Sequence, residues 1–319
     1  MSPVPPLGLL LDVDGPVASP ATRSVSRPGI LAALVELAGA GVPLVFNTGR
    51  SDTFLREQVV APLLAAGLPG TARVHAVCEK GAVRFSVRQG RATEVVADSS
   101  LAVPREVHEL VGGIVAARYA DTMFVDTTKR AMVSVEQRVD VPASRYAAAQ
   151  GPFEEEVLAA CAAAGLGVGL RGREVPDAQG RVPYRIDPTV IAVDVESVLL
   201  GKDRGAERAL ELLAADGELP ARWRTVGDSR TDYAMADLLH SRGLSVAHVD
   251  VRPGEGVPSR DYPVLVPEGA VEDEAGEAYL VRVAALLRGE RAEEAGGGFA
   301  WWGSGASRGV AESWAPPRA

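Results

Sequence analysis

Apolar residues recur along the chain with two different spacings, and these predict an alternation of buried strands and amphipathic helices. The short apolar run Leu7–Val13 is typical of a strand buried on both faces of a sheet. Pro28–Ala40 carries apolar residues at helical spacing, and Val42–Phe46 is a second apolar strand. A strand, a helix and a strand in this order predict a right-handed unit of a parallel sheet.

The same alternation continues on both sides of a middle region. A helix is expected from Ser51, as its cap, to Ala66, followed by a strand at Arg73–Cys78. Both stretches therefore indicate halves of one doubly wound, parallel-sheet α/β domain. The C-terminal half is expected to contain Lys202–Ala215, Thr231–His240 and Asp273–Leu287 as helices, with Arg222–Val226 and Leu244–Val251 as strands.

The middle region has an α+β pattern. A hairpin is expected around Gln89–Gly90, and helices near Pro104–Tyr119 and Pro152–Ala164. The sequence therefore predicts a core formed by residues 1–97 and 199–289, with an inserted α+β domain at residues 98–198. The strands expected in this insert are Thr122–Val125, Ala131–Gln137, Gly167–Arg173, Pro183–Ile186 and Thr189–Val195.

Residues 290–319 form a tail rich in glycine, alanine and serine, and this composition favours a disordered extension. The tail also contains Trp301, Trp302 and Trp314. The alternative is therefore a segment that docks its aromatic side chains on the body of the protein or on a second subunit.

The composition is that of an acidic globular protein. Of the 319 residues 47% are hydrophobic, and 33 basic against 42 acidic residues give a net charge of −9. This charge provides no field for binding nucleic acid, and no apolar run reaches membrane-spanning length. The N-terminus lacks the pattern of a signal peptide, and the two cysteines, Cys78 and Cys161, suit a reducing compartment. We therefore expect a cytoplasmic protein that binds neither nucleic acid nor membranes.

Polar residues stand where the predicted core strands end or where the core helices begin. In an open parallel sheet, ligands bind at the carboxyl ends of the strands, so these side chains are expected to converge. They are Asp12 and Asp14 in "LLLDVDG", Thr48 in "NTGR", Lys202 in "LGKDRG", and Asp228 and Asp232 in "GDSRTD".

These residue types indicate phosphoryl transfer. Carboxylates gathered at one site repel each other and need a cation, and hard oxygen ligands suit Mg²⁺. A hydroxyl, an ammonium and Mg²⁺ together match the oxygens of a phosphoryl group. One carboxylate can attack phosphorus to form an acyl phosphate, and a second can transfer protons.

The motifs DxDG, [ST]GR, Lys and GDSxxD, in this order, resemble the haloacid dehalogenase-like (HAD) superfamily of Mg²⁺-dependent phosphatases. The insert resembles the C2-type cap of the Cof-like and sugar-phosphate phosphatase branch. The resemblance implies that Asp12 is the nucleophile and that Asp14 is the acid and base. It further implies a phosphate site formed by Thr48, Gly49 and Lys202, and a Mg²⁺ site formed by Asp12, Asp14, Asp228 and Asp232.

Two features depart from the family pattern. Pro16 follows the DxDG motif where the family usually has threonine, so one backbone N–H is missing near the site. "CEKGA" stands where Cof-like relatives often have Asn-Gly, and its Lys80 could reach a second anionic group. The candidate substrate-binding residues are Arg50, Lys80, Lys129, Arg130, Glu136 and Arg185. A solvated loop lysine is the alternative for Lys80, and solvated charges on a sheet edge are the favoured interpretation for most of those in the insert.

The sequence thus predicts a Mg²⁺-dependent phosphomonoesterase that acts through an aspartyl phosphate on a small phosphorylated metabolite such as a sugar phosphate. The alternatives are a phosphosugar mutase, which returns the phosphoryl group to a sugar, and a catalytically silent sugar-phosphate-binding module. A glycosyltransferase with a DxD motif would leave Thr48 and Lys202 without a role.

Overall fold

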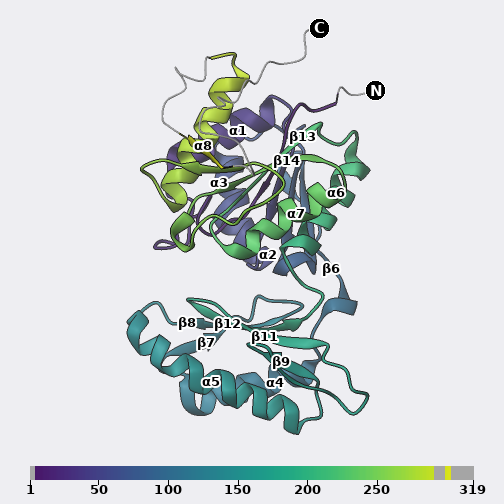
Figure 1. Ribbon diagram of the computed structural model, residues 1–319, viewed down its shortest axis with the longest axis vertical. Helices are drawn as coiled ribbons and strands as arrows, with labels where there is room; N and C mark the ends of the chain where they lie inside the picture. The colour runs from purple at the N-terminus through teal and green to yellow at the C-terminus, as the bar shows by residue number, and fades with distance from the viewer. Residues whose placement is uncertain (1–3, 291–298, 303–319) are drawn as a thin grey trace. The chain divides into compact units, whose positions relative to one another are not determined.

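The computed structural model describes residues 4–290 and 299–302. It contains two compact units (Figure 1). The first comprises Met1–Val96 and Gly201–Ala319, and the second is Ala97–Leu200. The chain therefore leaves the first unit once and returns to it once, so the second unit is an insertion.

A ten-stranded sheet forms the centre of the first unit, in the order β16-β15-β14-β13-β1-β2-β3-β4-β5, with β6 paired to β4. Its N-terminal strands are β1 (Gly8–Leu11), β2 (Leu44–Asn47), β3 (Val74–Cys78), β4 (Val83–Arg88), β5 (Arg91–Ala92) and β6 (Val96–Ala97). The others are β13 (Arg222–Gly227), β14 (Ser245–Asp250), β15 (Val264–Pro267) and β16 (Phe299–Trp302). The pairs from β15 to β3 are parallel, whereas β4 with β3, β5 with β4 and β16 with β15 are antiparallel.

Helices cover both faces of this sheet. Leu10 packs in one cluster with residues of α6 and α7, and its neighbours Leu9 and Leu11, which point to the other face, are also fully buried. The helices are α1 (Pro28–Gly39), α2 (Asp52–Leu55), α3 (Ala61–Ala65), α6 (Lys202–Asp216), α7 (Tyr233–Ser241) and α8 (Glu272–Leu287). The predicted doubly wound α/β core is confirmed.

The helix expected between Ser51 and Ala66 is not continuous. Ser51 caps α2 by accepting the N–H of Phe54, as predicted, but a π-helical turn at Arg56–Val60 separates α2 from α3. Pro62 lies in the first turn of α3 and cannot donate to the carbonyl four residues before it. A π-turn accommodates this missing hydrogen bond, so the helix changes its winding here.

The second unit is a six-stranded sheet in the order β10-β9-β11-β12-β8-β7, with helices α4 and α5 on one of its faces (Figure 1). Side chains such as Val135, Val195 and Phe153 form the apolar cluster between the sheet and these helices. An α+β insert is therefore confirmed. Its elements are β7 (Met123–Val125), β8 (Val133–Gln137), β9 (Val168–Leu170), β10 (Arg173–Val175), β11 (Tyr184–Pro188), β12 (Ala192–Ser197), α4 (Arg105–Ile114) and α5 (Ala143–Ala163).

Helix α5 begins nine residues earlier than the sequence indicates, at Ala143 and not at Pro152. Proline favours the first turn of a helix, and the sequence therefore predicts a start at Pro152. In the structure Pro152 lies inside the helix, where Tyr146 and Phe153 on either side of it are buried in the apolar cluster. Packing of this amphipathic face offsets the hydrogen bond that the proline removes.

Strands β15 and β16 of the core sheet were not predicted. Strand β15 is short, and β16 pairs with it through residues of the C-terminal tail. The rest of the tail, including Trp314 and the disordered extension expected there, lies outside the described residues. No helix in residues 4–290 combines the length and the hydrophobicity needed to cross a membrane.

Two buried histidines make the stability of the core depend on pH. Burial lowers the pKa of His248 from 6.5 to about 4, and that of His75 likewise. Above pH 6.5 His248 is neutral in both the folded and the unfolded chain. As the pH falls towards 4, only the unfolded chain takes up this proton, so the free energy of unfolding decreases.

For His248 the full shift, from 6.5 to about 4, corresponds to about 3 kcal/mol. We expect denaturant unfolding of His248→Asn to show a weaker loss of stability between pH 7 and pH 4.5 than the wild type. Asparagine can keep the hydrogen bond to Thr225, which is 2.8 Å from Nδ1 in the structure. An identical pH dependence in both proteins would contradict this assignment.

Candidate active site

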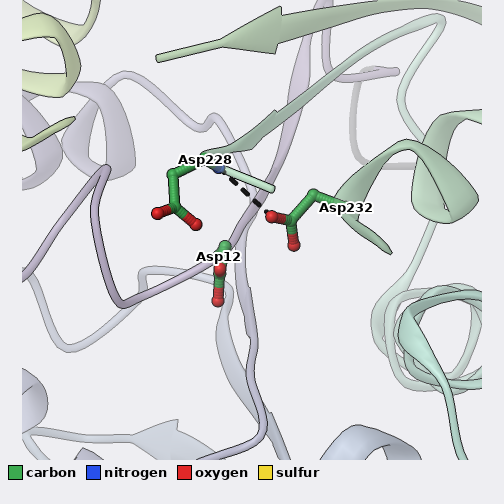
Figure 2. Close-up of side chains that lie close together, drawn as sticks. All are labelled: Asp12, Asp228 and Asp232. Atoms are coloured by element: carbon green, nitrogen blue, oxygen red, sulfur yellow. Dashed lines mark hydrogen bonds between the residues drawn. The ribbon is translucent and has the colours of Figure 1, made fainter. Parts of the chain in front are cut away.

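Three aspartates converge at the carboxyl end of the core sheet (Figure 2). Asp12 follows β1, Asp228 follows β13, and Asp232 ends the short 3₁₀ turn Arg230–Asp232. One carboxylate oxygen of each lies within 4.8 Å of those of the other two. Asp12 and Asp232 are 6% and 0% exposed, so the cluster lies inside the unit.

Lys202, at the first position of α6, binds two of these aspartates. Its Nζ lies 2.6 Å from Oδ1 of Asp12 and 2.6 Å from Oδ1 of Asp232. Nζ also donates to the backbone oxygen of Asn47 at 3.0 Å. Burial lowers the pKa of Lys202, but the charges of Asp12 and Asp232 outweigh it and raise the pKa above its ordinary value. The lysine is therefore a fixed cation.

One lysine does not neutralise three carboxylates. Burial, followed by the charge of Asp232, raises the pKa of Asp12 well above its ordinary range. The same two causes raise the pKa of Asp228 to about 7. Burial also raises the pKa of Asp232, but the charge of Lys202 and the hydrogen bonds from Lys202 and Ser229 outweigh burial, so the pKa is lowered. The donor set fits a divalent cation, because three hard oxygen ligands with excess negative charge are what such an ion binds.

The backbone around Asp232 fixes its carboxylate. Oδ2 accepts the N–H of Asp228 at 3.1 Å, shown as a dashed line in Figure 2, and the N–H of Ser229 at 2.9 Å. The hydroxyl of Ser229 donates to the same oxygen at 2.6 Å. Gly227 leaves the space for this turn, because a Cβ there would collide with Cβ of Asp232. Only Oδ1 faces Lys202.

The loop after β1 brings a fourth aspartate near the cluster. Gly15 turns the chain at φ +92°, and a Cβ on it would lie 2.7 Å from Cβ of Asp228, so the position requires glycine. The carboxylate of Asp14 binds the guanidinium of Arg50. Nε and Nη2 of Arg50 donate to the two oxygens of Asp14 at 2.9 and 2.8 Å. Pro16 is buried in this turn, where its carbonyl packs against Gly276 of α8.

The loop after β2 lies beside the lysine. Asn47 Nδ2 donates to the backbone oxygen of Lys202 at 2.8 Å, which makes the contact between these two residues reciprocal. Thr48 is fully buried, and its hydroxyl accepts the N–H of Arg50 at 3.1 Å. Gly49 follows Thr48. The side chain of Lys80 lies against Gly49, and its Cε would be 3.6 Å from a Cβ added there.

Gly205 allows α6 to approach this loop. A Cβ at Gly205 would collide with Oδ1 of Asn47. Gly205→Ala is therefore expected to destabilise the protein by about 1–3 kcal/mol, although alanine is the better helix former. The matched control is Gly113→Ala in α4, where nothing lies within 4 Å of a Cβ and a gain of up to about 1 kcal/mol is expected. Denaturant titration of both variants measures these opposite signs, and equal effects would contradict the prediction.

Lys80 occupies a strained turn next to the same loop. Glu79 and Lys80 have φ angles of +49° and +52°, in the left-handed region that non-glycine residues avoid. The N–H of Lys80 donates to the carbonyl of Thr48 at 3.0 Å, and its carbonyl accepts the N–H of Gly201 at 3.0 Å. The turn thus joins the backbone of the β2 loop to the start of α6.

The predicted residues of the insert fall in two places. Lys129 and Arg130 lie in the loop between β7 and β8. Glu136, on β8, and Arg185, on β11, belong to the sheet, and Arg185 Nη2 donates to Glu196 at 2.6 Å and to the carbonyl of Leu200 at 2.6 Å. A cavity of about 400 Å³ in this unit has Arg185 in its wall, together with Arg173 and Tyr184, which sequence reasoning did not select.

Three further residues of the core site were not assigned from the sequence. Asn47 and Ser229 lie inside the motifs "NTGR" and "GDSRTD", so their position was a usable signal. Arg252 follows β14 and contacts Asp228, with Nε 3.4 Å from Oδ2 and 3.1 Å from the backbone oxygen. This last contact joins segments that only the fold brings together.

Compared by sequence, the chain matches no family model and no curated protein. Solved structures do match it. The C-terminal domain of trehalose-6-phosphate phosphatase from C. albicans has a TM-score of 0.56 at 16% identity, covering 90% of this chain and 93% of that one. A haloacid dehalogenase-like hydrolase from Bacteroides thetaiotaomicron has a TM-score of 0.53 at 12% identity, covering 88% and 98%. The chain therefore shares the fold of these two proteins.

Proposed function

We propose that the chain is a Mg²⁺-dependent phosphomonoesterase that acts through an aspartyl phosphate on a small phosphorylated metabolite such as a sugar phosphate. The observation that carries the proposal is the contact of Lys202 with Asp12 and Asp232, each at 2.6 Å. These residues come from three separate segments of the chain and form a charged cluster that apolar packing does not explain. The shared fold with a trehalose-6-phosphate phosphatase supports a sugar phosphate as the substrate.

In the proposed first step, a carboxylate oxygen of Asp12 attacks phosphorus, and the bond from phosphorus to the ester oxygen breaks. One oxygen of Asp12 is held by Lys202 and by the N–H of Val13, so we assign the attack to the other. Asp14 gives its proton to the departing oxygen. The phosphoryl oxygens are held by Lys202, whose Nζ donates to the backbone oxygen of Asn47, and by Thr48, the next residue after Asn47.

In the proposed second step, Asp14 takes a proton from water as the water attacks the phosphorus of the aspartyl phosphate. The bond between phosphorus and Asp12 then breaks, which releases phosphate and restores the free carboxylate. Mg²⁺ bound to Asp12, Asp228 and Asp232, and to the backbone of Asp14, would neutralise charge on the phosphoryl group.

Release of inorganic phosphate from a panel of phosphorylated metabolites, with Mg²⁺ present, tests the proposal. Release from at least one sugar phosphate is expected, and its absence from every ester would overturn the proposed function. A mutase would instead isomerise a sugar phosphate and release little phosphate. A binding module would change the melting temperature with a sugar phosphate but would release nothing.

The role of Asp14 can be tested by changing the leaving group. An alkyl alkoxide needs a proton as it departs, whereas nitrophenolate barely does. Asp14→Asn should therefore slow the first step by about 10²-fold or more with a sugar phosphate and only mildly with p-nitrophenyl phosphate. Because the second step still lacks its base, rapid-quench experiments should show a burst of nitrophenol with phosphate left on Asp12. If Asp14→Asn shows no burst and no leaving-group dependence, the role assigned to Asp14 is wrong.

A further inference from the structure

Among residues 4–290, Arg50 is the residue whose side chain binds the carboxylate of Asp14. Arg50 donates to both of its oxygens, from Nε at 2.9 Å and from Nη2 at 2.8 Å. Two parallel N–H···O bonds from a planar guanidinium fix both the position and the plane of a carboxylate. The side chain of Asp14 is 33% exposed, so without this contact it would be free to change rotamer.

Arg50 is itself fixed. Its side chain is 10% exposed, and its guanidinium lies 4.7 Å from the centre of the Phe54 ring. Its backbone N–H donates to the hydroxyl of Thr48 at 3.1 Å, and its carbonyl accepts the N–H of Glu79 at 3.1 Å. Arg50 is therefore a rigid connection between the loop that contains Thr48 and the carboxylate of Asp14.

We propose that Arg50 is a positioning residue that orients Asp14 relative to the phosphate-binding loop, and that it does not bind the substrate. The inference rests on the proposed phosphatase function, because it concerns the two proton transfers assigned to Asp14. In both transfers the carboxyl must lie within hydrogen-bond distance of the reacting oxygen. A misplacement of about 1 Å can slow such a step by about 10²-fold.

Arg50→Met removes the two hydrogen bonds and keeps an apolar side chain of similar length against Phe54. We expect kcat for a sugar phosphate to fall by about tenfold to a hundredfold, while KM changes less than about twofold. The first step with p-nitrophenyl phosphate, which barely needs the proton, should stay within about threefold of the wild type. Arg50→Lys keeps the charge but cannot form the paired contact, so it should recover only part of the loss.

A double-mutant cycle separates positioning from substrate binding. If Arg50 acts only through Asp14, adding Arg50→Met to Asp14→Asn should slow the sugar phosphate no further. If Arg50 binds the substrate, KM should rise for both esters, and the two losses should multiply, which would overturn the inference. Wild-type protein that releases phosphate from no ester would instead overturn the proposed function.

Arg56→Met is the matched control. Arg56 lies six residues after Arg50, at the start of the π-helical turn, 4.9 Å from the centre of the Phe85 ring, and its Nη2 donates to the carbonyl of Thr93. Its kinetics should equal those of the wild type. Melting temperatures of all variants show whether each is folded. If Arg50→Met does not fold, the kinetics of Arg50→Lys test the inference instead. A loss of activity in Arg56→Met equal to that in Arg50→Met would show a general effect on the segment from Arg50 to Arg56 and overturn the inference.

Discussion

Asp12→Asn is expected to lower phosphate release from every ester by at least about 10⁴-fold, because an amide cannot form the acyl phosphate. The loss should be the same for a sugar phosphate and for p-nitrophenyl phosphate. Asp14→Asn differs, since its effect should depend on the leaving group. Phosphate release, and mass spectrometry of quenched protein for a phosphorylated residue, measure the result.

The same substitution should leave the fold intact or stabilise it. Burial raises the pKa of Asp12, which means that its ionised form is costly where it lies. Asparagine removes one of three crowded carboxylates, so the melting temperature should not fall. Asp216→Asn is the control, because Asp216 binds His75 and Arg88 away from the cluster and should retain activity. Residual turnover in Asp12→Asn that depends on the ester would contradict the nucleophile assignment.

Removal of divalent metal is expected to abolish activity, and Mg²⁺ should restore it. Ca²⁺ should support activity poorly, because it prefers longer bonds and a looser geometry. Full activity in the presence of EDTA would contradict the proposed mechanism. The physical reason is the cluster itself, in which three carboxylate oxygens lie within 4.8 Å of one another with one lysine against two of them.

Metal binding has a second measure that does not depend on turnover. An ion that binds only the folded chain stabilises it, by about 2.7 kcal/mol when its concentration is 100 times its dissociation constant. Mg²⁺ should therefore raise the melting temperature of the wild type. In Asp228→Asn this rise in melting temperature should be much smaller. Glu211→Gln, at an exposed position of α6, is the control and should show the same rise as the wild type. Equal shifts in all three proteins would place the ion elsewhere.

Hydrophobic periodicity located the central strands of the core because each is a buried apolar run, although it missed the short strand β15. Leu9, Leu10 and Leu11 are all fully buried, so one short run predicts both the strand and the helices that cover it. Proline gave the weaker signals. The π-turn accommodates the missing N–H of Pro62, whereas Pro152 is tolerated inside α5 because its neighbours Tyr146 and Phe153 pack in the apolar cluster.

The residues of the cluster were predictable from the sequence, but several of their partners were not. Motif order and strand ends bring Asp12, Lys202 and Asp228 to one edge of a sheet. Which side chain Arg50 would bind depends on the path of the loop after β1, and this path depends on Gly15 and on packing against α8. Such contacts join segments far apart in sequence, so no local pattern encodes them.

The return of the chain from the insert has a consequence for engineering. The second unit ends at Leu200, and Lys202 follows two residues later, with Gly201 hydrogen-bonded to Lys80 in the core. Every residue of the aspartate–lysine cluster belongs to the first unit. The second unit can therefore be exchanged by protein engineering at two points of the chain, after Val96 and before Gly201. Foreign inserts placed between Val96 and Gly201 would change the second unit alone and leave every residue of the aspartate–lysine cluster in place.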